Sequence, residues 1–222
     1  MPALLGEADL VKTLQQLPGV AVGTEGMTGL YVRGGGADEN LYLLDGNPVY
    51  HVNHLLGFFS AFNPDAIKNT RFYKGSFPAE YGGRLSSVVD VRMNDGNRQE
   101  YHGNISVGLL SARANLEGPI VKDRSSFNIS VRRTWLDLIT GTALAIVNKN
   151  SDTKESFGYH FFDINAKVNH SFSERSRAYL SFYMGQDAFR QGSKEKHEDS
   201  DDMFLWRWGN LIGSAGWNYV FG

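Results

Sequence analysis

The stretch Asp163–Gly185, DINAKVNHSFSERSRAYLSFYMG, alternates between apolar and polar residues on both sides of a short polar segment. The apolar positions of its two arms are Ile164, Ala166 and Val168, then Ala178, Leu180, Phe182 and Met184. Side chains of a β-strand point alternately to its two faces, so this period of two predicts a β-hairpin. One face of the hairpin is apolar and the other is polar. The function of the chain depends on what covers each face.

Strand-like patterns dominate the chain from about Tyr101 onward, where helical patterns fade. They are GNISVGL (103–109), ARANLEG (112–118), SSFNISVRRT (125–134), HFFDINAKVNHSF (160–172), SRAYLSFYMG (176–185) and an aromatic stretch from Phe204 to Phe221. The apolar positions change from odd to even numbers at Leu109-Leu110, which indicates a tight hairpin near Gly108–Ser111. We therefore expect six antiparallel strands.

The links between these strands differ in length. Residues 118–125 and 172–176 form short links, whereas residues 135–159 and 186–202 form long polar ones. Short turns at one end and long loops at the other are typical of an outer-membrane β-barrel. The aromatic residues of the last strand resemble the interfacial girdles of such a barrel: Phe204, Trp206, Trp208, Trp217, Tyr219 and Phe221. A soluble β-sandwich with one buried face explains the same patterns.

The first hundred residues mix short helices with short strands. GEADLVKTLQQLPGV (6–20) predicts a helix that ends at its Pro-Gly pair, and NPDAIK (63–68) predicts one short helix capped by Asn63. Strands are expected at 20–22, 30–33 and 41–46, and in TRFYKG (70–75) and SSVVDVRM (86–93). Short strands and helices wound together make a compact α+β module.

Composition excludes several classes of function. The 222 residues carry a formal net charge of −2, without the basic field that a nucleic-acid-binding protein usually shows. The chain has no cysteine, which excludes thiol catalysis, disulfides and zinc–thiolate sites. Its first residues do not form a signal peptide. The longest apolar run, LITGTALAIV (138–147), is shorter than the ~20 residues of a membrane helix.

Four motifs occur in order within the first hundred residues. They are LPGV (17–20), YVRGGGADEN (31–40), YLLDGNPVY (42–50) and FYKGSFPAEYGGRLSSVVDV (72–91). In this order and spacing they closely resemble the plug domain of TonB-dependent outer-membrane receptors. The resemblance covers nearly all of residues 1–96, and the predicted strands begin where the barrel of that family begins.

The resemblance implies an α+β plug domain, residues 1–96, with a small mixed sheet and short helices. It also implies that residues 97–222 are antiparallel hairpins, the first six or so strands of a barrel with roughly 22 strands. Such a receptor binds a scarce nutrient and imports it with energy transmitted by TonB, while the plug gates the barrel. The chain lacks a signal peptide and a TonB box and stops after about six strands, so we expect a fragment, truncated at both ends.

The resemblance also implies a location and a set of partners. The location is the outer membrane of a Gram-negative bacterium, with the plug inside the barrel and facing the periplasm. The partners are TonB, the remainder of the barrel, outer-membrane lipid and a nutrient ligand. The nutrient class stays open between siderophores, cobalamin, glycans and peptides, and a surface lipoprotein would join for the last two. No enzyme activity, cofactor, metal or nucleic acid is expected.

The candidate site residues come from the plug motifs. Glycines in Arg33-Gly34-Gly35 and in Tyr81-Gly82-Gly83-Arg84 allow backbone bends that aim one guanidinium each. Asp45-Gly46 predicts a tight turn after an apolar strand. By resemblance, Arg33 and Arg84 face acidic groups on the barrel wall, where bidentate arginine–carboxylate pairs hold the plug reversibly.

The polar residues give less support to a metal site, a phosphate-binding loop or a hydrolase. HVNH (51–54) supplies two histidines without a third metal ligand nearby. RGGG (33–36) is not followed by the Lys-Ser/Thr of a phosphate-binding loop. The Ser, His and Asp residues form no nucleophile motif, which argues against a hydrolase. The remaining alternative is a soluble β-rich adhesin or carbohydrate-binding module.

Six strands are too few to close a membrane barrel, which needs about eight. Such a sheet keeps two edges of free N–H and C=O groups, which recruit other strands. Its apolar face is also exposed in water, and large exposed apolar patches drive association. We therefore expect the chain to self-associate in the absence of detergent.

Overall fold

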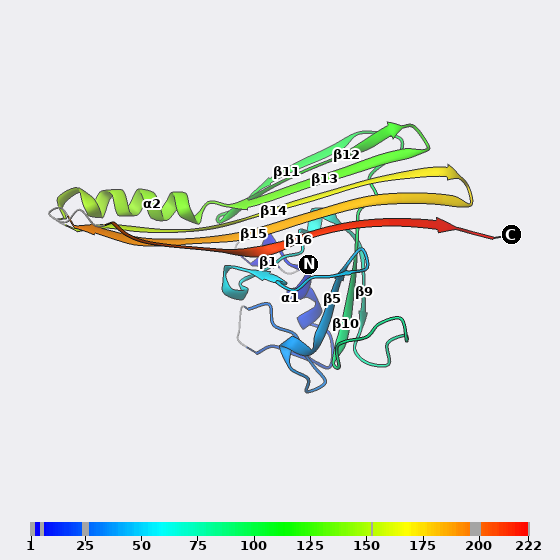
Figure 1. The fold of residues 1–222 in the computed structure, drawn as a ribbon, viewed down its shortest axis with the longest axis horizontal. Helices are drawn as coiled ribbons and strands as arrows, with labels where there is room; N and C mark the ends of the chain where they lie inside the picture. Colours follow the sequence, from blue (N-terminus) through cyan, green and yellow to red (C-terminus); the bar gives the residue numbers. More distant parts are fainter. Residues whose placement is uncertain (1–2, 5–6, 24–26, 152, 196–200, 222) are drawn as a thin grey trace.

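The computed structural model describes the chain apart from residues 1–2, 5–6, 24–26, 152, 196–200 and 222. It contains two parts, an N-terminal region up to residue 96 and a sheet of six long strands (Figure 1). The N-terminal region lies against one face of the sheet (Figure 1). The predicted combination of a small α+β unit with antiparallel hairpins is confirmed.

The N-terminal region is built on a mixed four-stranded sheet in the order β6-β5-β10-β9. Its strands are β5 (Asn40–Leu44), β6 (Asn47–Pro48), β9 (Ile67–Tyr73) and β10 (Ser87–Met93). Strand β10 pairs in parallel with β5 and antiparallel with β9. The apolar residues of β5 and β10 pack with helix α1 (Leu10–Gln15) in one core, which includes Val11, Leu30, Val32, Val89, Val91 and Met93.

Local signals in the sequence explain the ends of the short elements. The Asp9 side chain caps α1 by accepting a hydrogen bond from the Lys12 N–H at 3.1 Å. Asn63 caps its segment as predicted, although the helix there is a single 3₁₀ turn, η3 (Pro64–Ala66). Asp45 and Gly46 have φ of 47° and 88° and form the predicted turn between β5 and β6. The other short elements are β1 (Ala3–Leu4), β2 (Glu7–Ala8), β3 (Val20–Ala21), β4 (Tyr31–Val32), η1 (Ala37–Glu39), β7 (Asn53–His54), η2 (Leu55–Gly57) and β8 (Phe59–Ser60).

The large sheet contains six antiparallel strands in sequence order, as predicted. They are β11 (His102–Val107), β12 (Ser111–Val121), β13 (Ser125–Thr134), β14 (Thr153–Ser173), β15 (Ser176–Glu195) and β16 (Asp201–Tyr219). The tight hairpin between β11 and β12 is confirmed, because the Gly108 N–H donates to the Ser111 carbonyl at 2.8 Å. The sheet is open, since β11 and β16 each pair on one side only.

Two expectations about the long links were wrong. The first link contains helix α2 (Leu136–Val147) and a 3₁₀ turn, η4 (Asn148–Asn150). The run LDLITGTALAIV is apolar around most of the helix and includes Thr and Gly, so it shows no amphipathic stripe from which a helix could be predicted. The second link is mostly strand, because the ladder between β14 and β15 continues to the pair Thr153–Glu195. The rest of that link, residues 196–200, lies outside the described residues.

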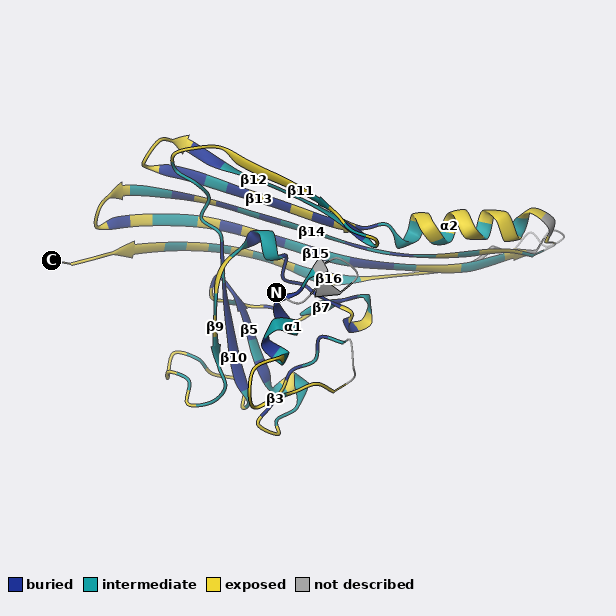
Figure 2. Ribbon diagram, turned by 180° about the vertical axis from the view of Figure 1, so that it is seen from behind, coloured by how far each residue is buried: buried dark blue, intermediate teal, exposed yellow. Residues whose placement is uncertain are grey.

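The two faces of the sheet differ sharply in polarity. The face toward the N-terminal region buries polar residues, whereas the outer face exposes apolar ones. Buried and more exposed residues accordingly alternate along the long strands (Figure 2). On β14 the outward positions from Phe162 to Phe172, ten residues apart, are apolar except for His170. A strand tilted at about 45° with a rise of ~3.4 Å per residue spans roughly 25 Å over this length, the height of a lipid-facing band. Within the described residues, no helix has the length and hydropathy needed to cross a membrane.

The aromatic residues of β16 do not all lie on the outer face. Trp208 pairs with Asp187 and Trp206 with Phe189, so these two side chains point to the inner face. By the same alternation Phe204 lies on the inner face. Trp217 and Tyr219 lie on the outer face and are exposed, and Phe221 packs edge-on against Tyr219. The girdle prediction therefore fits only this end of the strand.

Candidate functional site

The candidate site is the interface at which the N-terminal region contacts the polar face of the sheet. Main-chain carbonyls of β8 and of the residue after it accept hydrogen bonds from the sheet: Ser60 from Arg132 at 2.8 Å and Ala61 from the Tyr183 hydroxyl at 3.2 Å. The backbone of His51 makes two hydrogen bonds with the Asn210 side chain, at 3.1 and 2.7 Å. The interface therefore combines main-chain groups of one part with polar side chains of the other.

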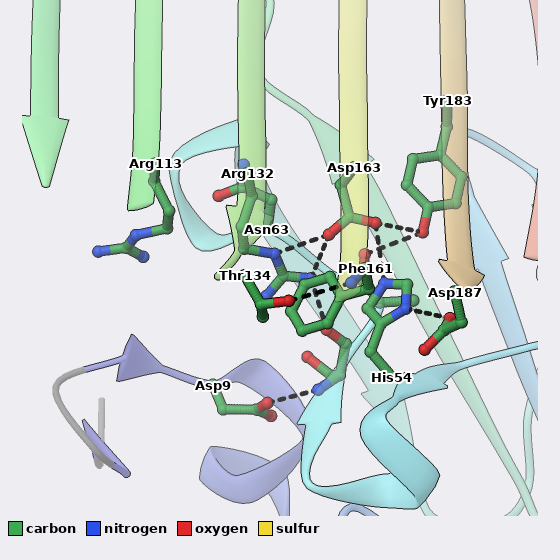
Figure 3. A network of polar contacts seen from close by, with 12 residues as sticks. Asp9, His54, Asn63, Arg113, Arg132, Thr134, Phe161, Asp163, Tyr183 and Asp187 are labelled. Carbon is green, nitrogen blue, oxygen red and sulfur yellow. Dashed lines mark hydrogen bonds and ion pairs between the residues drawn. The ribbon is translucent and has the colours of Figure 1, made fainter. Parts of the chain in front are cut away.

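His54 lies at the centre of this interface, between two carboxylates of the sheet (Figure 3). Its Nδ1 is 2.6 Å from Oδ2 of Asp187, and its Nε2 is 2.9 Å from Oδ1 of Asp163. All three side chains are at least 98% buried. The imidazole stacks on the Phe161 ring at a centroid distance of 4.2 Å, and the Arg132 Nε donates to Asp163 at 2.7 Å.

These contacts determine the charge of His54. Burial lowers the pKa of the imidazole, but the adjacent Asp163 and Asp187 outweigh it and raise the pKa to about 9. His54 is therefore protonated at neutral pH, and both ring N–H groups donate to carboxylates. Arg132 and His54 balance the two aspartates, while the hydroxyls of Tyr159 and Tyr183 donate to Asp187 and Asp163, respectively. We refer to these six residues, from β7 and β13–β15, as the histidine cluster.

A second buried charge, Lys167, joins the two parts four residues after Asp163 on β14. The Lys167 ammonium lies 3.2 Å from Oδ2 of Asp45, 3.1 Å from Oδ1 of Asp95 and 3.2 Å from the Met93 carbonyl. Lys167 is only 6% exposed. Burial raises the pKa of the Asp95 carboxyl, but Lys68 and Lys167 outweigh it, so the pKa lies below its usual value. Lys167 thus ties the Asp45 turn to the sheet.

The structure brings two of the predicted motif segments together. A Cβ on Gly35 would lie 2.5 Å from the Ser86 hydroxyl, so only glycine allows the Arg33–Gly35 loop to pack against the segment after Arg84. Ser86 in turn donates to the Val32 carbonyl at 3.0 Å. Arg33 and Gly34 have φ of 51° and 85°, the backbone bend that the glycines predict.

The other predicted site residues lie apart from the histidine cluster. Tyr81 donates to Asp90 at 3.4 Å, and Gly82 and Gly83 form an exposed bend in which Gly83 has φ of 82°. Arg84 is exposed and donates to the Gly83 carbonyl at 2.9 Å. Arg33 is exposed as well, and neither arginine makes an ion pair within the part of the chain that the structure describes. Of the predicted residues, Asp45 forms an ion pair with the sheet, through Lys167.

The sequence reasoning missed the histidine cluster. HVNH was considered only as a metal site, and the structure separates its two histidines, with His51 exposed and His54 buried. No group of three or more potential metal ligands occurs among the described residues. Asp163 alternates with the apolar positions of the hairpin predicted at 163–185 and therefore belongs to its polar face. This alternation was the available signal for the cluster.

Comparisons with known proteins agree with the two parts of the fold. The family model of the TonB-dependent receptor plug domain matches residues 4–89. The chain carries a TonB-dependent receptor plug domain. This plug domain supplies His54, Asp45 and Asp9 as well as Arg33 and Arg84.

Solved structures extend the likeness to the sheet. The siderophore receptor PirA from Acinetobacter baumannii is 16% identical with a TM-score of 0.52, and the match covers 90% of this chain and 37% of that receptor. PirA from Pseudomonas aeruginosa is 17% identical with a TM-score of 0.51, with 93% and 39% covered. The plug domain and the six-stranded sheet together thus have the fold of one portion of a TonB-dependent receptor. No curated protein matches the chain significantly.

Proposed function

We propose that the chain forms part of a receptor that binds a scarce nutrient in the outer membrane and imports it with energy from TonB. TonB-dependent receptors as a family are outer-membrane proteins of Gram-negative bacteria. In the proposal the apolar face of the sheet contacts lipid, its polar face lines the barrel, and the plug domain closes the lumen from the periplasmic side. The partners are TonB, further barrel strands, lipid and the nutrient.

The observation that carries this proposal is the polarity of the interface between plug and sheet. The sheet buries charged and hydrogen-bonding groups there: Ser126, Asn128, Ser130, Arg132, Asp163, Asn165, Lys167 and Asp187. Beside them lies a smaller apolar contact between Phe161 of the sheet and Phe59 of the N-terminal region. An apolar interface would expose hydrophobic surface whenever the plug moved. Polar contacts can instead be exchanged for hydrogen bonds to water when the two surfaces separate. Such an interface suits a plug that must open reversibly.

A reversible cross-link between plug and sheet tests the proposal. The chain has no cysteine, and the side chains of Asn47 and Ser214 hydrogen-bond across the interface. We expect the Asn47→Cys/Ser214→Cys receptor to lose nutrient uptake when oxidised and to recover it on reduction. Each single cysteine variant serves as the control. Full uptake by the quantitatively cross-linked receptor, or uptake that persists without TonB, would overturn the proposal.

Ferric siderophores are the first nutrient class to test, because both solved relatives are siderophore receptors. We expect a strain without the gene to grow poorly under iron limitation when a siderophore is the sole iron source. Normal growth of that strain would exclude the siderophore tested and direct the assay to cobalamin, glycans or peptides. A glycan or peptide substrate would bring a surface lipoprotein as a further partner.

We also propose that Arg33 and Arg84 face acidic groups on barrel strands beyond β16. Their exposure in this chain and the packing of Gly35 against Ser86 support a shared, outward-facing arginine pair. The glycines Gly34, Gly82 and Gly83 give the two loops their bends. In the complete receptor, Arg33→Ala/Arg84→Ala is expected to weaken retention of the plug, measured as increased passage of a small antibiotic. An unchanged passage would exclude this role.

The boundary of the plug domain at residue 96 is a further proposal. The strand β10 ends at Met93, and residues 99–102 are exposed, whereas Asp95 and Gly96 are packed against β13 and β14. Limited proteolysis is expected to cut first at 99–102 and to leave two folded pieces. A chain that resists cleavage there until it unfolds as a whole would contradict the boundary.

A further inference from the structure

A groove of about 610 Å³ lies between α2 and the outer face of β14–β16, away from the plug domain. The helix is fixed there because the Thr140 hydroxyl donates to the Phe157 carbonyl at 3.0 Å, and Asp137 packs on Gly158. The neighbouring outward residue of β14 is His160, directly after the end of the apolar band at Phe162. The groove therefore begins where the lipid-facing band ends.

Two arginines line the groove side by side. Arg207 pairs with Ala188 and Arg190 with Leu205 across the β15–β16 ladder, so the arginines are diagonal neighbours on the outer face. Both are exposed, and neither makes an ion pair or hydrogen bond among the described residues. Diagonal neighbours are roughly 7–8 Å apart, with a somewhat shorter distance between their Cβ atoms, so the two guanidinium groups can bind one phosphate group together.

The acidic residues that line the groove do not neutralise these arginines. The Asp137 carboxylate pairs with Arg133 at 2.7 Å and lies 3.6 Å from His160. Glu155 belongs by strand alternation to the opposite face, and its backbone makes two hydrogen bonds with the Asn148 side chain. Within the described part of the chain, the groove therefore keeps two positive charges without an ion-pair partner.

Apolar residues surround the charged pair. They are Leu144 of α2 and Met203 and Leu205 of β16, which line the groove together with the arginines. The opposite side of α2 is apolar and exposed as well, at Leu138, Ile139, Ile146 and Val147. The helix therefore adds exposed apolar surface next to the end of the lipid-facing band. The groove thus offers cations for a headgroup and apolar walls for an acyl chain.

We propose that this groove binds a membrane lipid with a phosphate headgroup, held by Arg190 and Arg207, with its acyl chain along Leu205 and the outer apolar band. The inference rests on the proposed function, because it places the outer face in a membrane. The occupant is a lipid rather than free phosphate, since the apolar side of the groove, at Leu144, Met203 and Leu205, continues into the band.

Binding of phosphatidylglycerol by the full chain in maltoside micelles tests this site, with phosphatidylcholine as the neutral comparison. Native mass spectrometry is expected to show at least tenfold tighter binding of phosphatidylglycerol. The difference should fall below about twofold in Arg190→Gln/Arg207→Gln. The matched control, Lys122→Gln/Arg175→Gln, removes two exposed charges at the turns at the other end of the strands. It should keep the tenfold preference for phosphatidylglycerol.

Other outcomes would overturn either the lipid site or the proposed function. Equal binding of both lipids by the parent chain, or an unchanged preference in the arginine variant, would exclude the lipid site. Displacement of the lipid by millimolar inorganic phosphate would indicate a site for free anions and would overturn the lipid assignment. A chain that stays a folded monomer without detergent would instead refute the proposed function.

Discussion

The plug domain and the six-stranded sheet bury opposite kinds of side chain. The plug domain follows the rule of soluble proteins and encloses Val11, Leu30 and Val89 completely. The sheet encloses Ser126, Asn128 and Asp163 completely, while Leu180 is 65% and Leu211 72% exposed. One chain therefore contains a part whose apolar residues point inward and a part whose apolar residues point outward.

This difference shows that burial depends on what surrounds each surface. Apolar side chains leave water, so in the plug domain they form a core. In the sheet the same preference places apolar side chains on the face that a lipid phase would cover. The polar side chains of the other face form hydrogen bonds and ion pairs with the plug domain. Disrupting the polar contacts of the interface should consequently destabilise the plug domain. Adding charges to the apolar face should change how the sheet associates in water.

Breaking the histidine cluster is expected to give the largest effect. His54→Ala leaves Asp187 without its cation, and removal of one partner from a buried ionic network costs about 3–5 kcal/mol. Urea unfolding of the detergent-solubilised chain should show this loss in the transition of the plug. His51→Ala, an exposed histidine three residues earlier, is the matched control and should change stability by less than about 0.5 kcal/mol. Equal losses in both variants would contradict the assigned role of the cluster.

Raising the pH should weaken the same contact without a mutation. The pKa of His54 is about 9 in the folded chain and 6.5 as a reference, so the folded state binds the proton more tightly. Its contribution of about 3 kcal/mol is complete below pH 6.5 and is lost as the pH rises through 9. The unfolding free energy of the parent chain should fall across this window more steeply than that of His54→Gln. Parallel pH profiles would refute the charge assigned to His54.

Placing charges on the outer face of the sheet should reduce self-association in water. Leu180 and Leu211 are exposed on this face, and burial of a leucine side chain contributes about 1.5–3 kcal/mol. The Leu180→Lys/Leu211→Lys variant should therefore dissociate at a concentration at least tenfold higher than the parent in sedimentation without detergent. Gln16→Lys on the exposed surface of the plug domain is the control. A parent chain that sediments as a monomer would contradict the expected association.

The arginines of the plug motifs should give the smallest effect in this chain. Arg33 and Arg84 are exposed, so Arg33→Ala and Arg84→Ala should each change the free energy of unfolding by less than about 0.5 kcal/mol. This result would separate them from His54, because their proposed partners belong to other strands. A loss of 2 kcal/mol or more in either variant would place a partner within this chain.

Much of the fold could be predicted because its signals are local. Period-two alternation predicts the hairpins, a change of parity at Leu109-Leu110 predicts the first of them, and Asp45-Gly46 predicts a turn. The lengths of β14 and β15 could not be predicted, because their outer ends carry polar residues that a loop would also carry. The helix α2 was missed because its apolar residues form no stripe.

The sequence by itself determined which residues share a face and, through four ordered motifs, the kind of domain that precedes the sheet. It could not assign a partner to any polar residue of that face. His54 lies 109 residues from Asp163 and 133 from Asp187, and Asp45 lies 122 residues from Lys167. Alternation depends only on neighbours along the strand, whereas these ion pairs exist only because the plug domain docks on the sheet. Tertiary structure therefore decided which charges meet.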